Sequence, residues 1–161
     1  DEKVDREKEH FWVMGLMSDN LIHYIELVSL GTLNSALIHP REVFRVAVIK
    51  GTASMILAHN HPSGNLIPSP EDIDVTKQLV QVGLLHGIPV QDHIIITSRS
   101  YFSMRAEKMW EEIENDTKYK PKYIIEYERT IKMVREMKKR GADIQFIVDV
   151  TGLTKEEIEN L

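Results

Sequence analysis

The sequence predicts an α/β fold, a mixed β-sheet flanked by helices, followed by a helical C-terminal extension. Three observations support this prediction. Two apolar runs, residues 11–17 and 21–30, are separated by polar residues 18–20 and are typical of a β-hairpin. A short apolar run, residues 55–58, lies between two stretches with helical spacing, which indicates a buried strand. Beyond residue 105 only helical patterns occur.

Proline and glycine mark the ends of the two helices expected in the core domain. Pro40 suits the first turn of one helix, and Gly51 follows its end. The apolar side chains of this helix are expected on one face: Val43, Phe44, Ala47 and Val48. Residues 70–86 have helical spacing and end before Gly87, with an apolar face formed by Ile73, Leu79, Val80 and Leu84. The segments GIPVQDHIIITS and YFSM predict two further strands, so the core domain is expected to span residues 1–105.

The extension, residues 106–161, is expected to be helical. A first helix, a break at residues 118–121 and a long basic helix ending at Arg140 are followed by two short helices around a Thr-Gly-Leu turn. Thr154 and Glu157 match a capping box at the start of the second short helix. The pair resembles a helix-turn-helix, but its last helix, KEEIENL, lacks a basic surface. We therefore favour a small helical hairpin packed on the long helix.

Composition excludes several classes of protein. The 161 residues, 42% hydrophobic and 28% charged, suit one core domain with an appendage, and no apolar run approaches the roughly 20 residues that cross a bilayer. Zero cysteines exclude disulfides, a cysteine nucleophile and thiolate-bound metal, and favour a cytoplasmic location. The start, DEKVDREKEH, has neither an initiator Met nor a signal-peptide pattern, so we expect a piece of a longer protein.

The net charge of -5 is unevenly distributed. Residues 117–140 carry nine Lys or Arg and three Glu, so the rest of the chain is strongly acidic. A basic helix can be a solvated face, which we favour, or a surface that contacts nucleic acid or protein. The acidity of the whole chain argues against a general DNA-binding protein.

The stretch AHNHPSGNLIPSPEDID, residues 58–74, carries the strongest indication of chemistry. His59 and His61 would face opposite sides of an extended strand, but Pro62 breaks the strand and lets both imidazoles turn toward one point. Asp72 follows a loop long enough to fold back and deliver a carboxylate. Two imidazoles and one carboxylate, with a fourth position for water, are the pattern of a catalytic Zn²⁺ site. We therefore predict these three residues as metal ligands.

Each part of this pattern also has a simpler interpretation. A His-x-His pair is more often two ordinary polar residues than a pair of ligands. Ser69, Pro70 and Asp72 are also what the start of a helix requires: an N-cap, a proline at the first position and an acid in the first turn. The complete spacing makes coincidence a poor explanation. A helix start would in addition fix where Asp72 points.

This spacing, His-x-His-Pro-x6-Ser-x2-Asp, resembles the JAMM motif of the JAB/MPN metalloprotease superfamily, and HNHPSG with PSPEDI is similar to its RadC-type branch. The resemblance covers residues 10–105, including GTLNSALIHPREVF and DHIIIT. It implies a JAB/MPN sandwich related to the cytidine-deaminase fold, and zinc bound by His59, His61 and Asp72. It also implies that a metal-activated water cleaves a peptide or isopeptide bond, with Ser69 as donor to the oxyanion and a glutamate from an earlier strand as general base.

Glu26 is the candidate for that general base. It is an acid in the apolar run LIHYIELVSL, where a half-buried carboxylate needs a reason to exist. In the alternative interpretation Glu26 occupies the solvent face of its strand, and Ile25 and Leu27 point inward. Glu42 is a second candidate, but its position on a predicted amphipathic helix favours a solvated role.

The remaining histidines, tryptophans and asparagines are given supporting roles. His93, in DHIIIT, is expected to anchor a loop to a strand rather than bind metal. Trp12 and Trp110 are expected in the core or against helices. Asn60 and Asn65 are candidates for orienting the loop or the substrate. The histidines without a partner at ligand spacing are expected on the surface or in turns: His10, His23, His39 and His86.

Three functions remain open at this point. The leading prediction is a zinc metallopeptidase-like hydrolase in which Glu26 takes a proton from water and passes it to the leaving amine. The second is a binding module with an idle metal site and a basic tail that contacts nucleic acid or protein. The third is hydrolysis of a non-peptide amide or carbamate.

Other classes of zinc enzyme are disfavoured, because the HExxH motif is absent and nucleobase deaminases need cysteine ligands, which this chain lacks. The loop of residues 62–68 lacks the insertions with which related deubiquitinating enzymes bind ubiquitin-like tails, so ubiquitin is not predicted as substrate.

Overall fold

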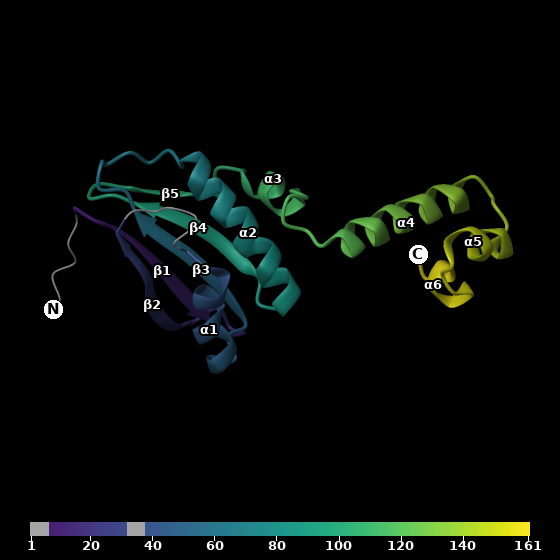
Figure 1. The fold of residues 1–161 in the computed structure, drawn as a ribbon, viewed down its shortest axis with the longest axis horizontal. Coiled ribbons are helices and arrows are strands. Elements are labelled where there is room, and N and C mark those ends of the chain that lie inside the picture. Colours follow the sequence, from purple (N-terminus) through teal and green to yellow (C-terminus); the bar gives the residue numbers. More distant parts are fainter. Residues whose placement is uncertain (1–6, 32–37) are drawn as a thin grey trace. The chain divides into compact units, whose positions relative to one another are not determined.

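The chain divides into two compact units, a first that ends at Tyr119 and a second, Lys120–Leu161 (Figure 1). The computed structural model describes residues 7–31 and 38–161. The sequence places the end of the core domain at residue 105, where the family resemblance ends. By contacts the first unit continues to Tyr119, because the short helix α3 (Trp110–Asn115) packs against the second helix of the core.

A five-stranded mixed sheet forms the centre of the first unit, in the order β2-β1-β3-β4-β5. The strands are β1 (Glu9–Leu16), β2 (Ile22–Gly31), β3 (Ser54–Asn60), β4 (Val90–Ile96) and β5 (Tyr101–Ser103). The first two form the predicted hairpin, β1 also pairs antiparallel with β3, and β5 pairs antiparallel with β4. Only β3 and β4 are parallel, and such a pair needs a crossover connection, which a helix supplies here. The predicted class, a mixed sheet with flanking helices, is confirmed.

The two core helices are α1 (Pro40–Lys50) and α2 (Pro70–His86). Each begins with the predicted proline, and each ends at a glycine in the left-handed conformation, Gly51 and Gly87. The predicted apolar faces were wrong at two positions, since Val48 is 56% and Leu84 48% exposed. Each helix packs into the core through one of its own sides, so residues at the margin of its apolar stripe stay in solvent.

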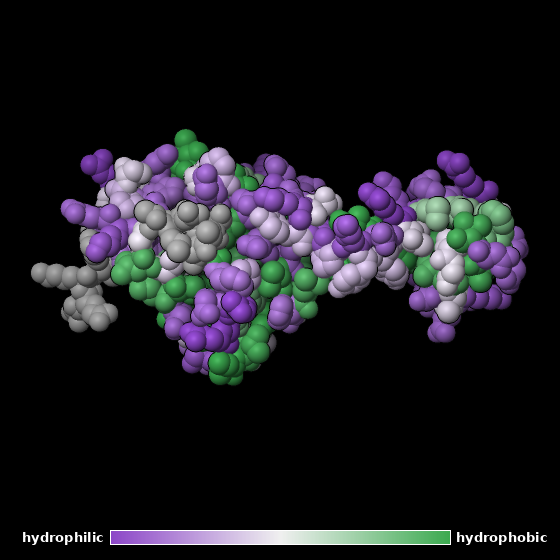
Figure 2. All heavy atoms as spheres, in the orientation of Figure 1, coloured by the Kyte–Doolittle hydropathy of each residue, from purple (hydrophilic) through white to green (hydrophobic). Residues whose placement is uncertain are grey.

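The hydrophobic core lies between one face of the sheet and these helices. Strand residues and helix residues meet in it: Phe11, Val13, Met55, Leu57 and Ile95 with Val43, Phe44, Val75 and Leu79. On β2, by contrast, Ile25 is 59% and Leu27 47% exposed. Figure 2 shows hydrophobic atoms (green) on the surface over β2 and at the end of α1. Side chains on the helix-covered face of the sheet are therefore the ones that are shielded from solvent.

The second unit consists of α4 (Lys122–Lys139), α5 (Ile144–Thr151) and α6 (Lys155–Glu159). Its small core contains one fully buried side chain from each helix: Val134, Ile147 and Ile158. Gly152 turns the chain between the two short helices, and α6 starts with the predicted capping box. The helical extension is thus confirmed. Within the described residues, no helix is both long and apolar enough to cross a membrane.

A network of charged side chains ties α2 to the end of the first unit. Lys77 donates to Asp116 over 2.7 Å, and Asp74 accepts from Lys118 over 2.5 Å and from the Tyr119 hydroxyl over 2.7 Å. The hydrogen bond from Lys77 holds the pKa of Asp116 below its usual value, and the hydrogen bond from Lys118 does the same for Asp74. Both carboxylates therefore favour the folded state in their ionised form.

We expect this network to make the first unit acid-sensitive. A carboxylate with a lowered folded pKa contributes stability above its unfolded pKa, and this contribution is lost as the pH falls through the folded value. The free energy of unfolding should therefore decrease below about pH 4, and the double variant Asp74→Asn/Asp116→Asn should show a shallower decrease. Tryptophan fluorescence in urea can follow this, since Trp12 and Trp110 both lie in the first unit. Glu107→Gln, on an exposed turn, is the control; equal acid sensitivity of the two variants would contradict the assignment.

Candidate metal centre

Strand and helix geometry bring His59, His61 and Asp72 together. His59 is the penultimate residue of β3 and shares the helix-covered face with Leu57, so its side chain is fully buried. His61 lies just beyond the strand, and its backbone N–H donates to the Ile96 carbonyl and continues the pairing with β4. Asp72 is the third residue of α2 and is also buried.

The ligand atoms of these three residues all lie within 4.8 Å of one another. His59 Nε2 is 3.0 Å from His61 Nε2 and 3.3 Å from Asp72 Oδ1, and His61 Nε2 is 3.3 Å from Asp72 Oδ2. Zn–N and Zn–O bonds of about 2.0–2.1 Å in a tetrahedron place two ligand atoms about 3.3 Å apart. The group therefore fits a tetrahedral ion with three protein ligands, and it could hold a metal ion.

The helix start fixes the carboxylate of Asp72. Ser69 is the N-cap of α2, and its backbone N–H and its hydroxyl both donate to Asp72 Oδ2 over 2.7 Å, while Asp72 N–H donates to Ser69 Oγ over 3.1 Å. This is a capping box closed by an aspartate. Burial raises the pKa of Asp72, but the adjacent His59 imidazole and the hydrogen bonds from Ser69 outweigh it and hold the pKa well below the usual range. Asp72 is therefore an anion at neutral pH.

A hydrogen bond orients each imidazole from behind. His61 Nδ1 lies 2.7 Å from the Asn65 carbonyl, which can only accept, so Nδ1 carries the proton and Nε2 is free for a metal. His59 Nδ1 lies 2.8 Å from His93 Nε2. Asn65 thus orients a ligand candidate through its backbone, a role not suggested from the sequence, and its side chain accepts from the Ile67 N–H over 3.0 Å within the loop.

His93 does not have the expected role of anchoring a loop. It lies within β4, beside Leu57 of β3, and is fully buried. Its Nε2 contacts His59 and its Nδ1 lies 2.6 Å from the Thr76 hydroxyl. Burial and the neighbouring His59 lower the pKa of His93 well below its usual value, so the ring is neutral. No pattern in the sequence indicated that His93 contacts His59, because the two residues lie 34 positions apart. The spacing of one helical turn between Asp72 and Thr76 was the available signal for Thr76.

Glu26 lies on the same face of the sheet as His59. It pairs with Val13 of β1, which pairs in turn with Leu57, two residues before His59 in β3. Glu26 is half-buried, whereas Ile25 and Leu27 are exposed, so the alternative with these two residues inward is wrong. Glu42 is exposed on α1 and contacts Arg45 at 3.6 Å, which agrees with its expected solvated role.

The opposite face of the sheet forms a pocket beside His61. Its volume is about 400 Å³, and its lining residues are Trp12, Asn60, His61, Pro62, Gly64, Ile96, Thr97 and Ser98. Trp12 is half-buried and stacks on His10 with ring centroids 5.1 Å apart. It is therefore a pocket wall rather than the expected core residue. The expectation of a surface position was also wrong for His10, which is buried.

Asn60 fixes the floor of this pocket. Its side chain accepts from the His10 backbone N–H over 2.7 Å and donates to the Lys8 carbonyl over 2.9 Å, which joins the end of β3 to the start of β1.

Trp110 has the expected core position and its ring also lies under Arg105. His23 and His86 are exposed and His39 is the N-cap of α1, all as expected.

Comparison with known proteins is a separate observation on most of the first unit. Residues 1–109 match the family model described as RadC-like JAB domain. The chain is 45% identical over 104 residues to a UPF0758 protein of Desulforudis audaxviator, covering 65% of this chain and 45% of the relative. A UPF0758 protein of Finegoldia magna is 55% identical over 97 residues, covering 60% and 44%. The chain thus spans less than half the length of the curated relatives that it matches.

The capping box at Ser69 predicts how substitution of this residue affects stability. Ser69→Ala should lower the free energy of unfolding by about 1 kcal/mol, because it leaves N–H groups of the first turn without their acceptor. Ser69→Gly should lower the free energy of unfolding by only a few tenths of a kcal/mol relative to wild type. Urea unfolding of the metal-free protein measures both. Equal destabilisation by the two substitutions would show that the cap contributes less than the contact to Asp72.

Proposed function

The chain belongs to the RadC-like JAB domain family, and we propose that it is a zinc-dependent hydrolase that cleaves peptide or isopeptide bonds. The observation that carries this proposal is the spacing of 3.0–3.3 Å among the ligand atoms of His59, His61 and Asp72. Three ligands leave a fourth tetrahedral position for water, which is typical of catalytic zinc sites.

Zinc is the metal that these donors suit best. Imidazole nitrogens together with one carboxylate, in a tetrahedral arrangement and without thiolates, favour zinc over magnesium or calcium, which prefer oxygen ligands and higher coordination. The ionised Asp72 carboxylate brings one negative charge into this site, which a divalent cation compensates. When bound, zinc lowers the pKa of a water to about 7 and polarises a substrate carbonyl.

Glu26 is proposed as the general base. Two strand spacings, about 10 Å, separate β2 from β3, so a water and the reacting group fit between the carboxylate and the ligand group. Glu26 would take a proton from the attacking water and then deliver it to the leaving nitrogen, because an amine leaves as a neutral group. Its position among apolar neighbours on the helix-covered face supports this role.

Ser69 is proposed as donor to the carbonyl oxygen that gains negative charge. Its hydroxyl is within reach of the site, since it contacts Asp72 Oδ2 over 2.7 Å. The backbone N–H of Ser69 makes a second contact of the same length to the same oxygen. The hydroxyl can therefore turn toward substrate while Asp72 keeps one of its two hydrogen bonds from this residue.

The pocket beside His61 is proposed to hold a substrate side chain. Trp12, Pro62 and Ile96 offer apolar contact, and the hydroxyls of Thr97 and Ser98 offer hydrogen bonds at the rim. Since His61 belongs to both the pocket and the ligand group, a residue next to the scissile bond can reach the pocket. A non-peptide amide is the alternative substrate, since activation of the water is the same for both.

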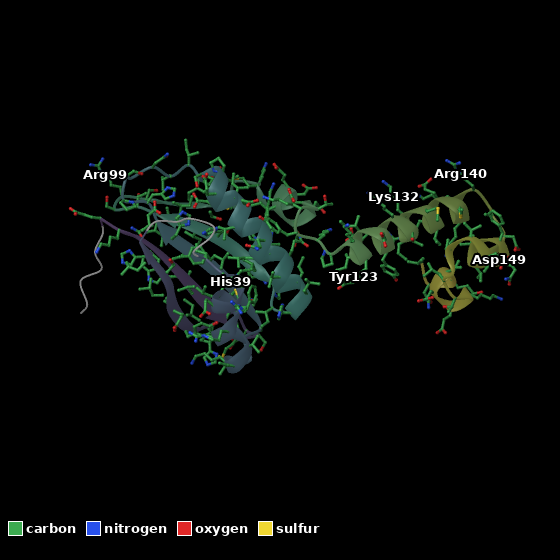
Figure 3. The ribbon with its side chains drawn as sticks, in the orientation of Figure 1. His39, Arg99, Tyr123, Lys132, Arg140 and Asp149 are labelled. Carbon is green, nitrogen blue, oxygen red and sulfur yellow. The ribbon has the colours of Figure 1, made fainter. Side chains whose placement is uncertain are left out.

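The basic segment is the weaker alternative for function. Four of its nine cations already have partners among the described residues: Lys118 with Asp74, Lys120 with Glu128, Lys139 with Glu136, and Lys138 with the last carbonyls of α6. Lys132 and Arg140 project outward from α4 (Figure 3). This pattern favours a solvated structural face, and contact of residues 117–140 with nucleic acid or protein stays a prediction.

Zinc content and peptide cleavage test the proposal together. Wild type should contain about one zinc per chain by mass spectrometry and should cleave members of a diverse peptide pool. Asp72→Asn should lose the metal and the activity. Glu26→Gln should keep the metal but lower kcat by about 10²–10⁴-fold, and Glu42→Gln should change neither. Absence of zinc from wild type after incubation with the metal would refute the proposal, and full activity of Glu26→Gln would refute the role of this residue.

Substitution in the pocket should affect binding more than chemistry. Trp12→Ala should raise KM for cleaved peptides by up to about 10-fold, the loss expected for one aromatic contact of about 1.4 kcal/mol, with kcat nearly unchanged. Ile67→Ala is the matched control, because Ile67 is an exposed apolar residue of the same loop region that does not line the pocket. Steady-state kinetics on one selected peptide decides, and a lower kcat at constant KM would contradict the pocket assignment.

A further inference from the structure

We propose that Thr76 and His93 are positioning residues for metal binding, because they hold the proton of His59 on Nδ1 and so leave Nε2 free as the ligand atom. The inference rests on the proposed function only in assuming that His59 Nε2 holds a metal. It concerns a feature of the protein itself, the tautomer of a buried histidine, and this feature can be measured without metal or substrate.

Four groups form a continuous chain of contacts behind the site. The Thr76 hydroxyl donates to the Asp72 carbonyl oxygen, one helical turn earlier in α2. The same hydroxyl lies 2.6 Å from His93 Nδ1, and His93 Nε2 lies 2.8 Å from His59 Nδ1. Thr76, His93 and His59 are all fully buried, so no water competes for these contacts.

The direction of the chain is set by the single proton of the Thr76 hydroxyl. Three acceptors are close to it: the Asp72 carbonyl, His93 Nδ1 and, at 3.7 Å, the sulfur of Met104. A thioether is a weak acceptor. A threonine within a helix donates readily to the carbonyl four residues before it. With its proton on the Asp72 carbonyl, the Thr76 oxygen can only accept from His93.

The remaining steps follow from the chemistry of a neutral imidazole, which has one N–H and one lone pair. If His93 Nδ1–H donates to Thr76, its Nε2 carries the lone pair and must accept. The partner of Nε2 is His59 Nδ1, which therefore carries the proton. His59 Nε2 is then unprotonated and faces His61 and Asp72, as a metal ligand must.

The reverse direction would disable the site. If the Thr76 hydroxyl donated to His93 Nδ1, then His93 Nε2 would donate to His59 Nδ1, and the proton of a neutral His59 would lie on Nε2. The Asp72 carbonyl would at the same time lose its donor from Thr76. A protonated Nε2 cannot bind a metal, so the direction of two buried hydrogen bonds decides whether His59 is a ligand.

His61 shows why His59 needs such a chain. The Nδ1–H of His61 meets a carbonyl, that of Asn65, which fixes the tautomer in one step. His59 instead has another histidine behind it, and a histidine can donate or accept. Thr76 removes this ambiguity because its own proton is held by the helix backbone. Both ligand histidines are thus set in the same tautomer by different means.

The tautomer can be read directly by NMR. Long-range ¹H–¹⁵N spectra of metal-free protein, with ¹⁵N-labelled histidine and His59→Gln for assignment, report which nitrogen of His59 is protonated. We expect a protonated Nδ1 in wild type and in Thr76→Ser, and loss of this single state in Thr76→Val, which keeps the shape but removes the hydroxyl. A wild-type His59 protonated on Nε2 alone would overturn the inference, whether or not the protein binds zinc.

Zinc affinity, measured by competition with a chromophoric chelator, supplies the second readout. Thr76→Val should weaken zinc binding about 10–100-fold, the range for loss of a partner behind a ligand histidine, and Thr76→Ser should restore it to within about threefold. Thr151→Val is the matched control, since Thr151 donates to the Ile147 carbonyl over 2.7 Å in the same way within α5. Unchanged affinity in a folded Thr76→Val protein would overturn the inference.

Variants at His93 keep the test decisive if Thr76→Val fails to fold. His93→Gln retains an acceptor for His59 and a donor for Thr76, so zinc binding should fall only a few-fold. His93→Leu fills similar space without an acceptor and should lose as much affinity as Thr76→Val. Equal zinc affinity of the two His93 variants would refute the proposed role. Normal tautomers in a wild type that binds no zinc would instead contradict the proposed function alone.

Discussion

The carboxylate of Asp72 is the constraint on which the rest of the site depends. One oxygen accepts two hydrogen bonds from Ser69 and completes the start of α2, and both oxygens face the imidazoles of His59 and His61. The start of the helix and one corner of the candidate metal site are therefore the same structure. Because the capping box allows little conformational freedom to Asp72, the start of α2 is held in a fixed position relative to the end of β3.

Burial gives this arrangement its electrostatic character. An anion without water nearby is costly unless it is paired and hydrogen-bonded, and Asp72 meets this condition with two contacts from Ser69 and two histidine neighbours. The same burial removes water from His59 and His93, so their hydrogen bonds are made within the protein. A preorganised site of this kind spends little free energy on rearrangement when a cation binds.

The division of the chain bears on where its chemistry lies. The family match ends at residue 109, and every residue of the candidate metal centre lies inside it. The second unit has its own small core, and much of its positive charge is neutralised by neighbouring acids or used to cap a helix. The candidate metal centre and the pocket beside it thus lie within the part of the chain that matches the family.

The sequence alone determined the elements that depend on near neighbours. Prolines and glycines predicted both ends of α1 and α2, and two apolar runs around a polar turn predicted the hairpin. The spacing from His59 to Asp72 identified the candidate ligand group, because caps and turns are set by residues a few positions apart. Boundaries were less accurate, and Val48 and Leu84 were assigned to the buried face although they are exposed.

Only the tertiary structure could place His93 behind His59 and Trp12 beside His61. These contacts depend on the parallel register of β3 with β4 and on the pairing of β1 with β3, which join residues far apart in the chain. No local pattern specifies such a register, since apolar alternation is the same for a strand paired in several ways. The sequence thus determined which residues could form the site. Strand pairing decided which partners orient them.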